Sequence, residues 1–286
     1  MLKYGVLLLV MIGCGGNLAP KPMPVHEQQS ARIESFWGLK EDTIAGMPVT
    51  LVKDSFEGNT PIANLLVLPG WDFERHRWLL ETNLRAYAKQ HHLLLILPEM
   101  KRSIYATHFY PETTPEARKE KTGTWLIDTF LPAIQKKYQI LLPGQTNMVL
   151  GLSTGGRGAV YCAWKCPKVF IAAASLSGDF NQAGMPRDYL MTSVYGPFEK
   201  YKSRWMHDDN LYAVSDSITI PVFIGHGRND KVVQFAQSQK MAEKMKAAHP
   251  KTQSLFVEGA GHDFKFWGTA LPMVFDFFEA VENAKK

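Results

Sequence analysis

The chain has 286 residues, of which 45% are hydrophobic and 21% charged, a composition typical of a globular protein and not of a disordered or collagen-like one. The 32 basic and 27 acidic residues give a net charge of +5, and this small excess, without a block of Lys or Arg, argues against nucleic-acid binding. The three cysteines, Cys14, Cys162 and Cys166, are too few for a disulfide framework, so apolar burial must stabilise the fold.

The first residues have the pattern of an export signal. Lys3 precedes an apolar run over residues 6–12 that is too short to span a bilayer. The sequence Met11-Ile12-Gly13-Cys14 resembles the lipobox of bacterial lipoproteins, in which the signal is removed before a lipid-bearing cysteine. The resemblance implies a signal peptide over residues 1–13, lipidation of Cys14, and a membrane anchor in the bacterial cell envelope. A plain secretory signal is the alternative, and it also predicts export.

A flexible spacer follows the signal. Residues 14–30 are rich in Gly, Pro and polar residues and lack hydrophobic periodicity, which predicts an extended link between the lipid and the folded part. We therefore expect a single folded domain over residues 31–286. Its sequence contains no apolar stretch as long as a membrane span.

The folded domain alternates short apolar runs with longer amphipathic segments. This alternation predicts an α/β fold in which a mostly parallel sheet has helices on both faces. We expect an antiparallel edge strand over 47–53, and buried strands over 65–68, 93–97, 148–150, 170–176, 221–225 and 255–257. We expect helices over 73–90, 116–138, 154–165, 232–248 and 269–283, with Pro132 kinking or splitting the second.

One connection between predicted strands is unusually long. Residues 178–219, after the sixth strand, are too many for an ordinary link and predict a small cap-like insert over the site. Its aromatic side chains either line a pocket or form a small core of their own. They are Tyr189, Tyr195, Phe198, Tyr201, Trp205 and Tyr212.

The most informative motif lies at residues 148–159, with the sequence MVLGLSTGGRGA. It contains G-x-S-x-G centred on Ser153, after a predicted strand and before a predicted helix. Such a sharp turn lifts a serine hydroxyl clear of the sheet, and Gly151 and Gly155 avoid steric collision there. The helix N-terminus also favours a nearby oxyanion. The motif predicts that Ser153 is a nucleophile, while a serine that merely caps the helix is the alternative.

Two later segments supply partners for a nucleophilic serine. Asp230 follows one buried strand and His262 follows the next, so both lie at the sheet edge where ligands bind in parallel sheets. The chain order of serine, acid and histidine is the one expected of hydrolases that use this serine turn. Asp179 is the main rival acid, and His226 is expected to be a structural histidine.

These segments, in this order, resemble the α/β-hydrolase fold. The stretches 65–71, 125–138 and 151–159 further resemble the putative esterase family, which includes esterase D, S-formylglutathione hydrolase-like and feruloyl esterase-like proteins. The resemblance implies Ser153 as nucleophile, His262 as general base and then acid, and Asp230 as the carboxylate that orients it. It also implies an oxyanion hole formed by the backbone N–H of Thr154 and one from the loop 68–72, for which we choose Trp71.

Together these features predict an exported serine hydrolase that cleaves carboxylic esters through an acyl-enzyme. Its partner would be a small-molecule ester, with a carbohydrate-linked ester as one candidate, and Trp71 and Trp267 are candidate substrate contacts. No metal, nucleotide or organic cofactor is expected. A serine peptidase or amidase using the same triad, and a non-catalytic surface-binding lipoprotein, are the alternatives.

Overall fold

The computed structural model describes residues 38–53 and 63–285. The predicted signal peptide, the lipidated Cys14 and the predicted spacer lie outside these residues. Among the described helices, none is both long enough and apolar enough to cross a membrane.

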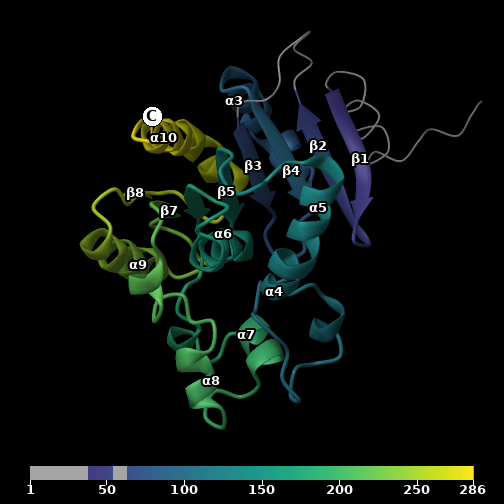
Figure 1. Cartoon of the computed structure of the whole chain (residues 1–286). Helices are drawn as coiled ribbons and strands as arrows, with labels where there is room; N and C mark the ends of the chain where they lie inside the picture. Colours follow the sequence, from purple (N-terminus) through teal and green to yellow (C-terminus); the bar gives the residue numbers. More distant parts are fainter. Residues whose placement is uncertain (1–37, 54–62, 286) are drawn as a thin grey trace, which may run out of the picture. The chain divides into compact units, whose positions relative to one another are not determined.

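A single eight-stranded sheet in the order β1-β2-β4-β3-β5-β6-β7-β8 organises the described residues (Figure 1). Its strands are β1 Gly38–Ile44, β2 Met47–Lys53, β3 Ala63–Leu68, β4 Leu93–Pro98, β5 Asn147–Leu152, β6 Ala172–Leu176, β7 Val222–Gly227 and β8 Gln253–Val257. The pairs β1–β2 and β2–β4 are antiparallel, and every other pair is parallel. The predicted α/β class is confirmed, as is the antiparallel strand at 47–53.

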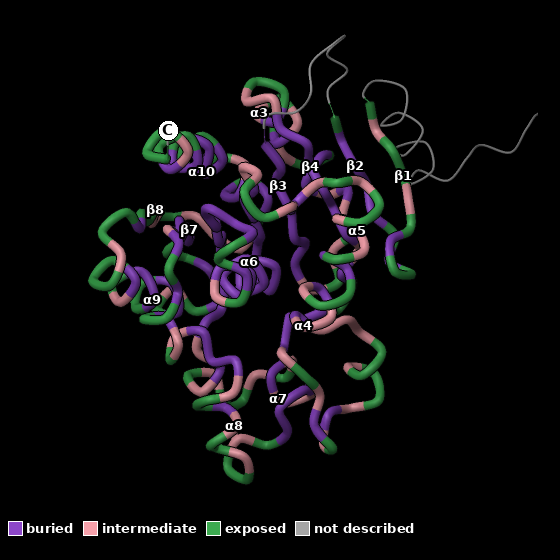
Figure 2. Tube along the Cα trace, in the orientation of Figure 1, coloured by how far each residue is buried: buried purple, intermediate pink, exposed green. Residues whose placement is uncertain are grey.

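Strand β1 was not predicted from the sequence. Its sequence GLKEDTI contains no apolar run, and most of its residues are exposed or half-buried at the edge of the sheet. By contrast, every residue of β3, β4 and β5 is buried, because helices cover both faces there (Figure 2). Continuous apolar runs mark such central strands, whereas an exposed edge strand carries no such signal.

Two helical layers cover the two faces of the sheet. Helices α2 Arg77–Glu81, α3 Leu84–Gln90 and α10 Phe264–Asn283 share one apolar core with side chains such as Leu65 and Leu150. Helices α5 Leu131–Tyr138, α6 Thr154–Lys165 and α9 Phe235–Ala248 share the other core, with side chains such as Leu66 and Val149. Neighbouring residues of one strand thus enter opposite cores, as the period of two requires.

Several helix boundaries differ from the predicted ones for local reasons. The predicted helix 73–90 is interrupted at Thr82, whose hydroxyl donates to Trp78 O and accepts from Leu84 N. The predicted helix 116–138 consists of η1 Ala117–Lys119, α4 Gly123–Trp125, a π-helical turn η2 Leu126–Phe130 and α5. The wide turn directly precedes Pro132, which lacks the N–H that a continuous α-helix would use. Helix α10 begins at Phe264, five residues early, because Asp263 caps it by accepting from Phe266 N.

The long connection between β6 and β7 contains four short helices. These are η3 Gln182–Gly184, α7 Tyr189–Tyr195, α8 Lys202–His207 and η4 Ser215–Ser217. The connection packs against residues 99–122, which follow β4, and the backbone N–H of Thr114 donates to Ser193 O. The sequence pattern did not indicate this second segment. Of the six aromatic residues noted in the insert, Tyr195 and Trp205 are fully buried in a small core that the two segments share.

Candidate active site

Ser153 occupies the sharp turn between strand β5 and helix α6. Its backbone has φ +54° and ψ −127°, a conformation that L-residues rarely adopt and that persists only where the surroundings enforce it. The turn is tight enough that a Cβ atom on Gly151 would lie 1.9 Å from Gly155 O, so position 151 requires glycine. The backbone N–H of Ser153 donates to Leu176 O at 2.8 Å, which fixes the turn to strand β6.

His262 lies between Ser153 and Asp230. Its Nε2 is 3.0 Å from Ser153 Oγ, and its Nδ1 is 2.6 Å from Asp230 Oδ2. The histidine follows β8 and precedes the capping residue of α10, whereas the aspartate follows β7. The structure therefore brings together the three side chains that the motif and the chain order predicted. The arrangement of nucleophile, base and orienting carboxylate is that of a serine hydrolase triad.

Asp230 is held as an ionised acceptor by four groups. Its Oδ1 accepts from the backbone N–H groups of Val232 and Val233, both at 2.8 Å, and its Oδ2 faces His262 and His226. Burial opposes ionisation of this carboxyl, but the hydrogen bonds from His226 and His262 outweigh it and hold its pKa well below the usual range. The carboxylate can therefore orient His262 and stabilise its protonated form.

His226 is a structural histidine, as predicted. It is fully buried, its Nδ1 is 2.7 Å from Ser238 Oγ, and its Nε2 is 3.1 Å from Val233 O and 3.2 Å from Asp230 Oδ2. A ring whose Nε2–H donates to these two oxygens, and whose Nδ1 accepts from the serine, satisfies every contact. The side chain thus helps to fix the same carboxylate oxygen that faces His262.

The rival acid, Asp179, contacts the buried Arg157 and not His262. Its Oδ2 lies 3.5 Å from Arg157 Nη1, and its hydrogen bonds among the described residues do not include His262. Burial raises the pKa of Asp179 to about 7, although the neighbouring Arg157 guanidinium acts in the opposite direction. An acid that carries a proton near neutral pH is poorly suited to stabilise a protonated histidine.

Two backbone N–H groups near Ser153 are candidate oxyanion donors. The loop after β3 lies against Ser153, since a Cβ atom on Gly70 would lie 3.1 Å from Ser153 Cβ. Buried Tyr105 fixes this loop by donating from its hydroxyl to Pro69 O at 3.0 Å. The backbone N–H groups of Trp71 and Thr154 do not donate to any other group of the described residues. Both predicted donors are therefore unengaged, on segments that adjoin the serine.

Trp267 lies in a position that contradicts its predicted role. Its side chain is fully buried within α10, and it donates from Nε1 to Ser177 Oγ at 3.1 Å. Its ring stands edge-on to the His262 ring, with 5.1 Å between centroids. The prediction of a substrate contact was wrong because α10 begins before this residue and turns it into the core. Trp267 instead packs against His262.

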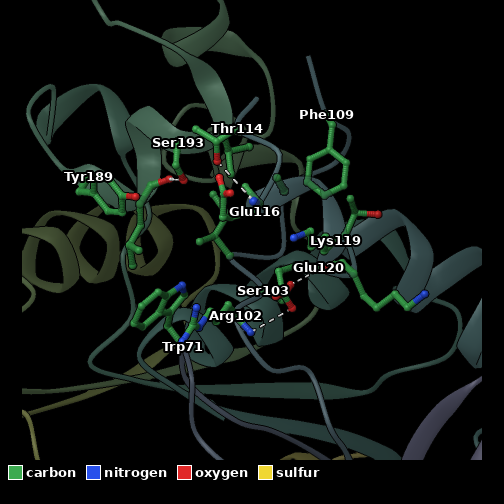
Figure 3. Close-up of a pocket in the computed structure, with 17 residues that line it drawn as sticks. Trp71, Arg102, Ser103, Phe109, Thr114, Glu116, Lys119, Glu120, Tyr189 and Ser193 are labelled. Carbon is green, nitrogen blue, oxygen red and sulfur yellow. Dashed lines mark hydrogen bonds between the residues drawn. The ribbon is translucent and has the colours of Figure 1, made fainter. Parts of the chain in front are cut away.

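Trp71 borders a cavity of about 350 Å³ (Figure 3). One wall comes from residues 102–122 and the other from residues 189–194 of α7. The lining is apolar at Ile104, Ala106, Phe109, Leu190 and Val194, and polar at Arg102, Glu116, Lys119, Glu120 and Lys121. Tyr189, 76% exposed, also lines it. Since Trp71 adjoins Gly70, the cavity borders the same loop that lies against Ser153.

The cysteines supply no competing nucleophile in the described part of the chain. Cys162 lies on α6 and Cys166 at its C-terminal cap, and both are unpaired and buried. Burial raises the pKa of the Cys162 thiol well above its usual value and that of Cys166 to about 11, so both remain protonated. No three His, Cys, Asp or Glu side chains among the described residues form a cluster suited to a metal ion.

Comparisons with known proteins show the family and the fold of the chain. The family profile described as putative esterase matches residues 54–278. An acetyl esterase from Caldicellulosiruptor saccharolyticus is 22% identical over 266 residues, which cover 86% of this chain and 96% of that protein. A fluorophosphonate-binding serine hydrolase F from Staphylococcus aureus superposes with a TM-score of 0.64 at 18% identity, covering 85% of this chain and 97% of the other. A ferulic acid esterase superposes with a TM-score of 0.62 at 20% identity, with the same coverage of both chains.

Proposed function

The chain belongs to the putative esterase family and is a carboxylic ester hydrolase with the α/β-hydrolase fold, and from this premise we propose that Ser153, His262 and Asp230 carry out the reaction through a covalent acyl-enzyme. The observation that supports this most directly is the continuous contact from Ser153 Oγ to His262 and from His262 to Asp230, at 3.0 and 2.6 Å. The pKa of Asp230, held low by its hydrogen bonds, supports the same assignment.

The proposed reaction has two halves. Ser153 Oγ attacks the ester carbonyl carbon while its proton moves to His262 Nε2, and the oxygen of the tetrahedral intermediate accepts from the Thr154 and Trp71 N–H groups. The bond to the alcohol oxygen then breaks, and the alcohol leaves with the proton from His262. A water molecule next attacks the acyl-enzyme and gives its proton to His262, and the acid leaves as the proton returns to Ser153 Oγ.

The cavity beside Trp71 is the proposed binding place for one side of the ester. Its apolar floor suits an aryl or short aliphatic group, and its charged rim suits hydroxyl groups, so a carbohydrate-linked ester is one candidate substrate. The relatives named acetyl esterase and ferulic acid esterase point to the same small range of acyl groups.

The test of the reaction compares wild type with Ser153→Ala on p-nitrophenyl esters of increasing acyl length. The wild type should hydrolyse the short esters, and the variant should lose on the order of 10⁶ in kcat while keeping its thermal unfolding temperature. Equal rates in the two proteins, or none in either, would refute the proposal. Turnover of peptide or anilide substrates without ester hydrolysis would favour the amidase alternative.

We propose in addition that the protein is exported and anchored by a lipid on Cys14, because residues 11–14 resemble a lipobox. Growth of a bacterial host with radiolabelled palmitate should label the wild-type protein, and the label should be lost in Cys14→Ala. A secreted Cys14→Ala protein that still hydrolyses esters would separate anchoring from catalysis. Labelling that survives this substitution would contradict the proposed anchor site.

A further inference from the structure

Arg157 is a buried cation on the helix that carries the nucleophile, and the proposed reaction does not use it. It lies four residues after Ser153 in α6, and its side chain is 1% exposed. A fully buried guanidinium is costly unless its donors are paired, so the groups that pair with it define its role.

The partners of Arg157 come from three separate parts of the insert. Its Nη1 lies 3.4 to 3.5 Å from Asp179 O, Asp179 Oδ2 and Gln182 Oε1. Its Nη2 donates to Tyr195 Oη at 3.1 Å and to Asp209 O at 2.9 Å. One side chain on the nucleophile helix therefore holds the start of the insert, the end of α7 and the segment after α8.

The same cluster reaches the second wall of the cavity. Tyr195 donates from its hydroxyl to Asp209 Oδ2 at 2.9 Å, and the same carboxylate oxygen accepts from Thr107 N at 2.7 Å. Thr107 belongs to the segment that supplies Ile104, Ala106 and Phe109 to the cavity. Both walls are thus connected to α6 through the contacts of Arg157.

We propose that Arg157 is a positioning residue that sets where the two cavity walls lie relative to Ser153, and thereby determines which ester sizes the enzyme accepts. This inference rests on the proposed function. Weakening the cluster should loosen α7 and the 102–122 wall without moving the triad, because the contacts of His262 and Asp230 come from other elements. The effect should then appear in KM for esters that reach the cavity, and not in kcat for the smallest ester.

Two mild variants test this role. Tyr195→Phe removes the hydroxyl between Arg157 and Asp209, and Arg157→Lys keeps the positive charge but loses the forked geometry. A neutral residue at position 157 would leave Asp179 and Asp209 buried without a cation and could unfold the protein, so it is avoided. The matched control is Tyr138→Phe on α5, whose hydroxyl donates to Asp42 of β1 and lies outside both the cavity lining and the contacts of Arg157.

The experiment measures kcat and KM of the full-length protein on p-nitrophenyl acetate and on two larger esters, p-nitrophenyl octanoate and 1-naphthyl acetate. The wild type should have a lower KM for at least one larger ester than for p-nitrophenyl acetate. Tyr195→Phe and Arg157→Lys should raise that KM about tenfold, as loss of one charge-assisted hydrogen bond allows. Both should keep kcat on p-nitrophenyl acetate within about threefold, since the triad is intact. Tyr138→Phe should change neither value.

Three results would overturn the inference and one would overturn the proposed function instead. The inference fails if the wild type binds large and small esters alike, if the variants slow both esters equally, or if Tyr138→Phe gives the same change in KM. If the wild type hydrolyses no ester at all, the proposed function fails. Because p-nitrophenyl acetate is measured in every protein, the two failures are distinguishable.

Discussion

Asp230 and Asp179 are both buried aspartates that follow neighbouring parallel strands, yet their surroundings give them opposite properties. Asp230 accepts two backbone N–H bonds and faces two histidines, and its pKa is held low. Asp179 shares a single guanidinium with Asp209, and burial raises its pKa to about 7. Burial alone therefore does not decide the charge of a carboxyl group. The number of donors aimed at its oxygens decides whether it serves catalysis or structure.

The largest expected difference between the two aspartates is in catalysis. Asp230→Asn should lower kcat by about 10⁴, because an amide cannot stabilise the protonated form of His262 or hold its tautomer. Asp179→Asn should leave kcat within about threefold, since this residue has no contact with His262. Steady-state kinetics on p-nitrophenyl acetate measures both. A large loss in Asp179→Asn, with the fold intact, would make Asp179 the triad acid after all.

The next largest effect should come from His226, the second histidine that contacts Asp230 Oδ2. His226→Gln should destabilise the protein by about 1 to 3 kcal/mol, because Ser238 Oγ and Val233 O lose a buried partner. It should also lower kcat by about tenfold, since Asp230 then has fewer donors and more freedom. Thermal unfolding and kinetics check the two effects. Ser238→Ala is the control, and it should give the smaller stability loss with nearly unchanged kcat.

The contrast between the aspartates also predicts a pH dependence of stability. The folded-state pKa of Asp179 lies above its ordinary value of 3.8, so its proton favours the folded state. This contribution is fully present below pH 3.8 and is lost as the pH rises through about 7. The wild type should therefore lose on the order of 1 to 3 kcal/mol, or several degrees in unfolding temperature, between pH 5 and pH 8.

Asp179→Asn isolates this contribution, because it keeps a neutral polar group that does not titrate. Its unfolding temperature should fall less over the same pH range than that of the wild type. Exposed Asp276 on α10 provides the control, and Asp276→Asn should retain the wild-type slope. Parallel curves for Asp179→Asn and the wild type would show that Asp179 is already ionised at pH 5.

The sequence predicted the central part of the fold because local pattern and tertiary burial agree there. Strands such as β5 are continuous apolar runs, and the serine turn requires small residues at fixed spacings, so both leave a local signal. Strand β1 leaves none, because its exposed residues are placed by pairing with β2. The early start of α10 depends on a capping contact of Asp263, which hydrophobic periodicity does not indicate.

The cluster around Arg157 shows the corresponding limit for the site. The triad was predictable because each member follows a strand, and parallel strands bring their ends to one edge. Arg157, in contrast, meets residues from α7 and from the segment after α8, and no periodicity relates these irregular segments to one another. The cavity walls could not be predicted for the same reason. The sequence shows only that an arginine stands one turn after Ser153, and its burial and partners are visible in the structure alone.

The smallest effect should come from substituting Trp267. This substitution tests whether the side chain supports His262 or contacts the substrate. Trp267→Phe keeps a ring near His262 but removes the Nε1 bond to Ser177 Oγ and part of the edge-on contact. We expect kcat to fall by about threefold with KM unchanged, because the side chain is fully buried and makes no substrate contact. A rise in KM for large esters without a change in kcat would restore Trp267 as a substrate contact. Phe278→Leu, buried in the same core and away from His262, is the control, and its effect should appear in the unfolding temperature rather than in kcat.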